Sequence, residues 1–308
     1  MAGKKKGVVG VVGLGIMGGA FAENLAAAGW RVVGYDIDAA RRRALARKGV
    51  EIAADAGEVA RLAPTLILSL PKPAALAATA AAIAAAGVRR RVVIDTSTFK
   101  LDDKIAAEAA LRKAGHVLLD CPVSGTGIQA KVKDLVVYAS GGPAEIKRLR
   151  PLFADFTRLV RDLGPFGNGS RMKYIANLLV AIHNVASAEA LVLGMKAGLP
   201  PQLVYDEIKI GAGSSRVFEL RAPMMVKGRY DKPTMKVSIW QKDMDIIGSF
   251  AQALGAPVPL FSAAQPIYAA ALASGYGEQD TAATCAVLEG LAGVKRGRSA
   301  AAQRRRRR

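Results

Sequence analysis

The chain has 308 residues, of which 51% are hydrophobic and 22% charged, so it can bury a large core and is long enough for two domains. Its two cysteines, Cys121 and Cys285, exclude a disulfide framework and favour a reducing compartment, which we take to be the cytoplasm. The net charge of +19 would by itself suggest a nucleic-acid partner, but eleven cations lie in two acid-free terminal segments and leave about +8 for the body.

Short aliphatic runs alternate with helical stretches over the first 169 residues. The predicted strands are 8–12, 31–35, 65–70, 91–95, 116–120, 135–139 and 158–162. The predicted helices are 18–29, 39–48, 74–86, 102–114 and 144–153. Because strands that alternate with helices pair in parallel through right-handed crossovers, we expect an α/β fold with a doubly wound parallel sheet.

The pattern changes after about residue 169. Residues 171–197 contain no proline and only one glycine, Gly194, and predict a single long helix. The stretch from there to about residue 293 contains helical segments and no convincing strand. We therefore expect a domain over 1–169, an all-helical domain over 170–296 joined by the long helix, and a basic, disordered tail over 297–308 whose deletion leaves folding and turnover nearly unchanged.

No membrane span is predicted. The longest uncharged stretch, 246–277, is interrupted by Pro257, Pro259 and Pro266 and diluted by glutamine and serine. A spanning helix needs about 20 continuous apolar residues. The terminal arginines 304–308 indicate a solvated tail more than a reader of DNA, so neither a membrane nor a nucleic acid is an expected partner.

Residues 11–25 read VVGLGIMGGAFAENL and follow Lys4, Lys5 and Lys6. Three lysines before an uncharged run could indicate a signal peptide. However, six glycines between residues 7 and 19 make a poor apolar core for a signal, whereas a strand, the spacing Gly13, Gly15, Gly18 and a helix make a dinucleotide-binding turn. The predicted cofactor contacts of this turn are Gly13, Leu14, Gly15, Ile16, Met17 and Gly18.

Asp36 closes the second predicted strand, 23 residues after Gly13. A carboxylate there accepts hydrogen bonds from ribose hydroxyls and repels a 2′-phosphate. Arg41, Arg42 and Arg43 could attract such a phosphate, although they also fit a solvated basic face. The balance favours NAD as the cofactor, with NADP as the alternative.

Four stretches in the order expected resemble the β-hydroxyacid dehydrogenase family, which has a Rossmann-type cofactor domain. The glycine turn resembles the cofactor signature, and residues 120–130 (DCPVSGTGIQA) resemble the substrate-binding loop. Residues 167–179 (GNGSRMKYIANLL) resemble the catalytic segment, and residues 240–246 (WQKDMDI) resemble a late Lys-Asp motif. The resemblance runs from about residue 7 to residue 293 and is specific to the superfamily.

The resemblance implies that Lys173 is the catalytic acid/base and that Asn177 hydrogen-bonds substrate. Oxidising an alcohol requires removal of its hydroxyl proton as hydride leaves, and an ammonium also stabilises a developing alkoxide. Asn177 lies four residues after Lys173 and hence on the same helical face. Without the resemblance, Lys173 would be better explained as a lysine whose stem packs on a long helix.

Further site residues follow from the same resemblance. Ser124, Gly125, Thr126 and Ser97 are the predicted additional substrate contacts, and Leu70, Pro71, Thr98 and Lys242 are additional cofactor contacts. Asp243 would orient Lys242 or cap its helix. Thr126 departs from the family pattern, which usually has a second glycine there, and this puts the substrate contact at that position in doubt.

No spacing of His, Cys or acidic residues predicts a metal site. His116 and His183 fit structural roles, and Cys121 fits a small buried residue better than a nucleophile. Lys100, Arg216 and Arg221 are possible extra anion contacts, each better explained as surface or structural residues.

These observations predict an NAD(P)-dependent oxidoreductase that moves hydride between the nicotinamide and a small β-hydroxy acid or its aldehyde or ketone form. The partners implied are a small carboxylate substrate and further copies of the chain in a homodimer or homotetramer. Thr126 and residues 211–225 resemble the L-threonate and tartronate side of the family. Two alternatives remain: an imine reductase, which usually carries another residue in place of Lys173, and a non-catalytic cofactor-sensing module with a basic tail.

Overall fold

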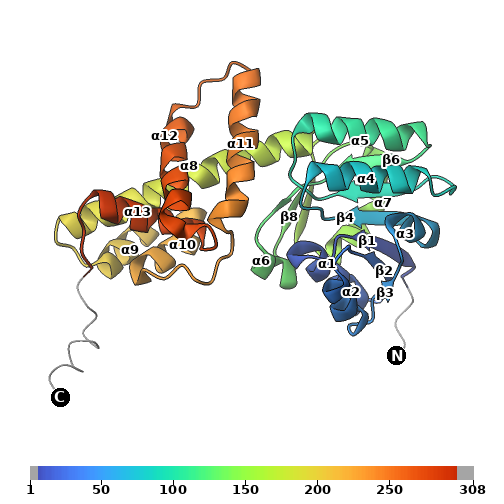
Figure 1. Ribbon diagram of the computed structural model, residues 1–308, viewed down its shortest axis with the longest axis horizontal. Coiled ribbons are helices and arrows are strands. Elements are labelled where there is room, and N and C mark those ends of the chain that lie inside the picture. The colour runs from blue at the N-terminus through green and yellow to red at the C-terminus, as the bar shows by residue number, and fades with distance from the viewer. Residues whose placement is uncertain (1–5, 297–308) are drawn as a thin grey trace. The chain divides into compact units, whose positions relative to one another are not determined.

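The computed structural model describes residues 6–296, and the chain divides into two compact units, Met1–Ile175 and Ala176–Arg308. The division falls within the long helix α8 (Asn168–Lys196), which contributes residues to both units (Figure 1). This helix begins three residues before the predicted start at 171 and ends one residue before the predicted end at 197. The predicted tail over 297–308 lies outside the described residues.

A six-stranded parallel sheet forms the centre of the first unit. Its strands are β1 (Val8–Val12), β2 (Arg31–Tyr35), β3 (Glu51–Ile52), β4 (Thr65–Leu68), β5 (Val92–Asp95) and β6 (Val117–Asp120). Their order is β3-β2-β1-β4-β5-β6, so the order reverses between β1 and β4. The predicted doubly wound parallel sheet is confirmed, and ligands of such sheets bind at the reversal, beyond the carboxyl ends of the strands.

Helices cover both faces of this sheet because successive side chains of each strand point to opposite sides. Val9 and Val11 join one hydrophobic core, whereas Val12 joins the other. The first core receives side chains from α1 (Ile16–Ala27), α2 (Ala39–Ala46) and α7 (Pro143–Ala154). The second receives side chains from α3 (Ala56–Leu62), α4 (Pro73–Ala84) and α5 (Leu101–Lys113).

A second, three-stranded sheet follows in the order β7-β8-β9. Its strands are β7 (Val123–Ser124), β8 (Val136–Ala139) and β9 (Leu159–Asp162), with the short helix α6 (Gly127–Lys131) after β7. The pair β7–β8 is antiparallel and the pair β8–β9 is parallel. Two predicted strands therefore belong to a separate mixed sheet, because β7 starts too soon after β6 to allow the long crossover that a parallel neighbour needs.

Helices make up the described part of the second unit. They are the C-terminal part of α8, then α9 (Pro201–Ile210), α10 (Arg216–Lys227), α11 (Val237–Ala253), α12 (Pro259–Ala271) and α13 (Thr284–Leu291). A π-helical turn, Leu272–Tyr276, and a 3₁₀ turn, Thr281–Ala283, lie between the last two helices. Within residues 176–296 the only β-type pairing is an isolated bridge between Lys236 and Asp280, so the predicted all-helical region is confirmed.

Helix α8 is long and apolar enough, on length and composition alone, to cross a membrane. This is weak evidence, because the core helix of a globular protein passes the same test. The helix carries buried polar side chains, among them Asn177, Asn184 and Ser187, each of which would be costly in lipid.

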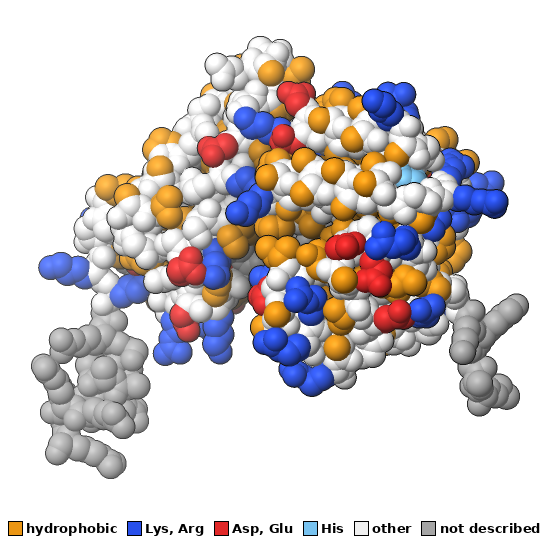
Figure 2. All heavy atoms as spheres, turned by 45° about the vertical axis from the view of Figure 1, so that its right-hand side comes forward, with side chains coloured by type: hydrophobic (Ala, Val, Ile, Leu, Met, Phe, Trp, Pro, Cys, Tyr) orange, Lys and Arg blue, Asp and Glu red, His pale blue; other side chains and the backbone are white. Residues whose placement is uncertain are grey.

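Charged side chains of both signs are interspersed on the face shown in Figure 2. Many pair with one another at the surface, for example Arg31 with Glu51 at 2.8 Å and Lys48 with Glu23 at 2.7 Å. Neighbouring acids therefore offset part of the positive charge of the body.

Candidate active site

The glycine turn joins β1 to α1 at the point where the strand order reverses. Gly13 has a φ of +90°, and a Cβ there would lie 2.2 Å from the carbonyl oxygen of Ser69, just after β4. A Cβ at Gly18 would lie 1.8 Å from the carbonyl oxygen of Gly13. Only glycine fits either position, because the turn is tight and the helix packs directly against it.

The first turn of α1 is suited to an anion. No side chain caps this helix end, and a Cβ at Gly15 would meet only the Arg41 side chain, at 3.4 Å. Ile16 is exposed, Met17 is half-buried and Leu14 is buried beneath the turn. The uncapped backbone N–H groups and the open approach over Gly15 therefore fit a pyrophosphate.

Asp36 braces this turn from the end of β2. Its Oδ2 accepts a hydrogen bond from the backbone N–H of Leu14 at 2.7 Å, and its Oδ1 accepts one from that of Asp38 at 2.8 Å. The carboxylate is nearly buried, and the guanidinium of Arg41 lies 3.4 Å from Oδ2. Arg42 donates to the carbonyl oxygen of Asp36 at 2.6 Å, so two of the three consecutive arginines contact Asp36.

The loops after β4 and β5 are tied together. The backbone N–H of Leu70 donates to the Ser97 hydroxyl oxygen at 3.0 Å, and the N–H of Ser97 donates to Oδ1 of Asp95 at 3.1 Å. Thr98 follows and is half-buried, and Pro71 is exposed. Ser97, expected from sequence to contact substrate, thus has a structural bond that holds the Leu70 loop beside Thr98.

The predicted substrate loop lies beside the glycine turn. A Cβ at Gly127 would lie 2.3 Å from Cγ2 of Ile16, and Asn24 of α1 donates to the carbonyl oxygen of Ala130 at 2.8 Å. Ser124 and Gly125 are half-buried just before α6. Thr126 is the N-cap of α6, and its backbone N–H and its hydroxyl both donate to Oε1 of Gln129, at 3.0 and 3.3 Å, so its side chain makes a structural contact that glycine could not make.

Lys173 lies in the first turns of α8 and is half-buried. The next residue, Tyr174, is buried and donates its hydroxyl to the backbone oxygen of Phe99, in the loop that also carries Thr98. Burial raises the pKa of Tyr174 to about 12, so the phenol stays protonated and remains a donor. The contact of Tyr174 with Phe99 thereby helps to hold the backbone of Lys173, the preceding residue, in place.

In the second unit, Asn177 and Lys242 meet at one carboxylate. Asn177 donates from Nδ2 to Oδ2 of Asp243 at 2.9 Å, and the ammonium of Lys242 lies 3.1 Å from Oδ1. Because an ionised carboxylate can only accept, the NH₂ group of Asn177 must face Asp243, and its carbonyl oxygen points the other way. Asp243, which the sequence associates only with Lys242 or a helix cap, thus also orients Asn177.

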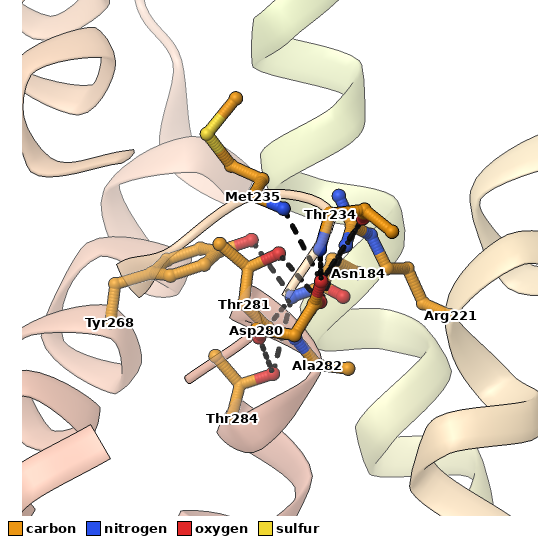
Figure 3. A network of polar contacts seen from close by, with 9 residues as sticks. All are labelled: Asn184, Arg221, Thr234, Met235, Tyr268, Asp280, Thr281, Ala282 and Thr284. Carbon is orange, nitrogen blue, oxygen red and sulfur yellow. Dashed lines mark hydrogen bonds and ion pairs between the residues drawn. The ribbon is translucent and has the colours of Figure 1, made fainter. Parts of the chain in front are cut away.

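Other residues considered from sequence have structural partners. Arg221 donates to both oxygens of Asp280, at 2.5 and 2.6 Å, and to Oγ1 of Thr234 at 2.5 Å (Figure 3). Arg221 is therefore committed within the helical unit and is not an open anion contact. His116 accepts a hydrogen bond from the backbone N–H of Arg91, and burial lowers the pKa of its imidazole. Cys121 is fully buried, and burial raises the pKa of its thiol, which disfavours the nucleophilic thiolate.

No group of three or more His, Cys, Asp or Glu side chains within residues 6–296 has the arrangement of a metal site. The strand order, the open glycine turn and the uncapped helix end fit a dinucleotide.

Two family profiles match consecutive parts of the chain. The NAD binding domain of 6-phosphogluconate dehydrogenase matches residues 8–164, and the NAD-binding domain of NADP-dependent 3-hydroxyisobutyrate dehydrogenase matches residues 167–288. The first match alone covers half of the chain.

Individual proteins with similar sequence or structure agree with these profiles. L-threonate dehydrogenase of Cupriavidus necator is 33% identical over 92% of this chain and 96% of its own. The 2-hydroxy-3-oxopropionate reductase of Escherichia coli K12 is 28% identical over 93% of this chain and 99% of its own. A Mycobacterium tuberculosis 3-hydroxyisobutyrate dehydrogenase structure with L-serine has a TM-score of 0.84 and 28% identity, and the match covers 91% of this chain and 98% of that one. The chain belongs to the β-hydroxyacid dehydrogenase family of NAD(P)-dependent oxidoreductases.

Proposed function

We propose that this dehydrogenase prefers NAD and acts on small hydroxy acids, with Lys173 as the acid/base of the reaction. The observation that carries the proposal is the placement of Lys173 one helical turn before Asn177, whose amide is oriented by Asp243. A second support is the set of relatives, which are named for L-threonate and 2-hydroxy-3-oxopropionate, or were solved with L-serine. These molecules share a carboxylate and an oxygen-bearing carbon nearby.

The nicotinamide, when bound, supplies the hydride acceptor for the alcohol or the hydride donor for the aldehyde or ketone. Lys173 Nζ in its neutral form takes the hydroxyl proton of the alcohol, and in its ammonium form it returns that proton in the reverse direction. The oriented carbonyl oxygen of Asn177 accepts a hydrogen bond from a substrate hydroxyl. The half-buried Ser124 hydroxyl and the backbone N–H of Gly125 hold the substrate carboxylate, since both are donors in the segment between β7 and α6.

The remaining roles complete the proposal. The glycine turn, Asp36, the Leu70–Pro71 loop, Thr98 and Lys242 bind the cofactor, and residues 1–169 and 170–296 act as the cofactor and substrate domains. A cytoplasmic location is part of the proposal, and the two free, buried cysteines support it.

Self-association through the helical unit is also proposed. Leu193 of α8 and Ile210 of α9 are 72% and 79% exposed, and large apolar side chains at the surface of these helices could be covered by a second copy of the chain. We expect the molar mass of two or four chains by light scattering, and a monomer at micromolar concentration would remove this part of the proposal.

The test of the reaction is a substrate panel followed by one variant. Purified protein with NAD should oxidise at least one of L-threonate, 3-hydroxyisobutyrate and L-serine, or reduce 2-hydroxy-3-oxopropionate with NADH, as read from NADH absorbance. Lys173→Ala should lower kcat by about 10²–10⁴-fold and leave NAD affinity nearly intact. Lys173→Arg should recover little, because a guanidinium stays protonated at working pH.

Lys196→Ala, an exposed lysine at the end of the same helix, is the matched control and should behave as wild type. Normal turnover by Lys173→Ala would remove the lysine from the mechanism. If the wild type is inactive on every acid tested, the alternative function, a non-catalytic cofactor-sensing module, would explain the protein better.

A further inference from the structure

A buried ionic cluster lies beneath the first turn of α8, apart from the residues that the proposed reaction uses. Lys104 of α5 is fully buried, and its ammonium lies 2.6 Å from Oδ1 of Asp120 and 3.2 Å from Oδ2 of Asp95. Both carboxylates are fully buried at the carboxyl ends of neighbouring strands, β6 and β5. Burial alone would lower the pKa of Lys104, but the two carboxylates outweigh it and raise that pKa, so the lysine is charged.

Asp120 is the junction of this cluster. Besides Lys104, it accepts the backbone N–H of Ser170 at 2.7 Å and the Ser170 hydroxyl at 2.8 Å. The Ser140 hydroxyl donates to Oδ2 of Asp120 at 3.3 Å, and the oxygen of this hydroxyl accepts the backbone N–H of Gly169 at 2.9 Å. One carboxylate and one hydroxyl thus satisfy N–H groups of the first turn of α8, which the helix itself cannot bond.

The position of Asp120 in the chain gives these contacts a consequence for the site. Three residues beyond Ser170 lies Lys173, and four residues beyond Asp120 lies Ser124. Asp95 meanwhile bonds the N–H of Ser97, which holds Leu70. The cluster therefore contacts the first turn of α8, which precedes Lys173, and the start of the loop that carries Thr98. It also includes the residue from which the substrate loop begins, Asp120.

Lys104 is the only cation among the charged groups of this cluster within the described residues. Without its ammonium, the buried carboxylates of Asp95 and Asp120 would have no cation between them. One of them would then become protonated, or the two would move apart. A buried ion pair of this kind adds little net stability over an apolar replacement, but it fixes the geometry of its partners. Displacement of the reacting groups by about 1 Å can slow catalysis by about 10²-fold.

We propose that Lys104 is a positioning residue: by holding Asp120 in place it fixes the first turn of α8, and with it the backbone of Lys173. The proposal rests on the proposed role of Lys173. It places Lys104 outside any contact with substrate or cofactor, acting through Asp120 and Ser170.

Three variants of the full chain test it. Lys104→Met removes the ammonium and keeps an apolar stem. Ser170→Ala removes only one hydroxyl donor and retains the ion pair, so it remains informative if Lys104→Met does not fold. Lys113→Met changes an exposed lysine on the same helix, α5, and is the matched control.

The first readout separates chemistry from binding. Single-turnover hydride transfer should slow by about 10²-fold in Lys104→Met and by about 10-fold in Ser170→Ala, whereas the Kd for NAD stays within about twofold, because the glycine turn lies on other elements. Lys113→Met should match wild type in both. Wild-type hydride transfer in Ser170→Ala and in folded Lys104→Met overturns the proposal, and so does a slower rate that is matched by an equal loss of NAD affinity.

The second readout needs no substrate. Amide hydrogen exchange over residues 170–174, followed by mass spectrometry, should accelerate in Lys104→Met and Ser170→Ala and remain unchanged in Lys113→Met. If wild type is inert on every acid but exchange responds as expected, the proposed reaction is wrong, whereas the proposal that Lys104 fixes the first turn of α8 stands. Unchanged exchange in both Lys104→Met and Ser170→Ala would overturn the proposal that Lys104 fixes this turn, whatever the activity of the variants.

Discussion

Asp36 has two roles that sequence alone presents as one. Its carboxylate holds the backbone of Leu14 in the glycine turn, and its charge lies 3.4 Å from the guanidinium of Arg41. A 2′-phosphate would have to displace this pairing, whereas ribose hydroxyls can donate to the carboxylate. The proposed preference for NAD over NADP therefore depends on Asp36 and Arg41 together.

This pairing gives a testable prediction for cofactor preference. Wild type should have a higher kcat/KM with NAD than with NADP, and Asp36→Ala should narrow the ratio by about tenfold or more, because Arg41 then becomes available to the phosphate. Adding Arg41→Ala to Asp36→Ala should abolish the gain with NADP. Asp36→Asn removes the negative charge but keeps an acceptor for the Leu14 N–H. It therefore distinguishes the effect of losing the charge from the effect of losing the hydrogen bond that holds the glycine turn.

The contrary outcome is simple to recognise from steady-state kinetics with both cofactors. A wild-type preference for NADP of tenfold or more would mean that Asp36 only braces the turn and that the arginines select the cofactor.

For single residues, the sequence predicts the roles that follow from local spacing. It does not predict contacts between residues that lie far apart in the chain. The glycine turn is predictable because three glycines, a strand and an acid have a fixed spacing. Lys104 could not be predicted as buried, because its helix reads LDDKIAAEAALRK and its partners lie 9 and 16 residues away in sequence, on two strands. The bond from Leu70 to Ser97 and that from Asn177 to Asp243 span 27 and 66 residues and carry no local signal.

Among whole elements, long periodic segments are predicted and two-residue strands are not. The strands 8–12 and 31–35 match β1 and β2 at both ends, since each contains consecutive valines, which are a strong signal for a strand. β3 and β7 have two residues each, too few for periodicity. α3 does carry a signal that could have found it in the letters DAGE: the side chain of Asp55, its N-cap, accepts the N–H of Glu58, and the side chain of Glu58 accepts that of Ala54, just before the cap.

The connection between α10 and the segment before α11 depends on Asp280. This fully buried carboxylate accepts from Arg221, from the N–H of Thr234 at 2.7 Å and from that of Ala282 at 3.0 Å (Figure 3). Its partners come from α10, from the loop over residues 228–236 and from the turn before α13. One carboxylate thus ties three segments of the helical unit together.

Asp280→Ala should therefore lower the free energy of unfolding by about 3–5 kcal/mol, because it leaves the Arg221 charge buried and unpaired. Urea unfolding followed by circular dichroism measures this loss. Glu219→Ala, which breaks the exposed pair between Glu219 and Arg216 on the same helix, is the control and should cost less than about 1 kcal/mol. Equal losses from the two variants would show that the Asp280 network adds nothing beyond a surface pair.

For the molecule as a whole, the sequence predicts the succession of an α/β region and a helical region, because the change from strand–helix alternation to helix alone is a change in composition and period. The boundary is harder to predict, since α8 is continuous and apolar through it. The division after Ile175 falls inside that helix, so the predicted boundary at 169/170 stays a prediction.

Arg296, the last residue that the structure describes, contacts both α10 and α13. Arg296 donates from Nη1 to the backbone oxygen of Val226 at 2.7 Å and from Nη2 to that of Met225, at the end of α10. Its Nε also lies 3.0 Å from Glu289 of α13. Arg296, which the sequence groups with the tail cations, therefore caps one helix and pairs with another.

Two truncations should consequently differ sharply although they end only two residues apart. Ending the chain after Arg296 should leave Tm and turnover nearly unchanged. Ending it after Val294, or replacing Arg296 by Ala in the full chain, should lower the free energy of unfolding by about 1–3 kcal/mol, because carbonyl groups of α10 and the carboxylate of Glu289 lose a charged donor. Thermal unfolding at matched concentration compares the three chains. A large loss on removing residues 297–308 alone would show that this segment has a structural partner, and equal stability of all three would show that the Arg296 contacts contribute nothing to the fold.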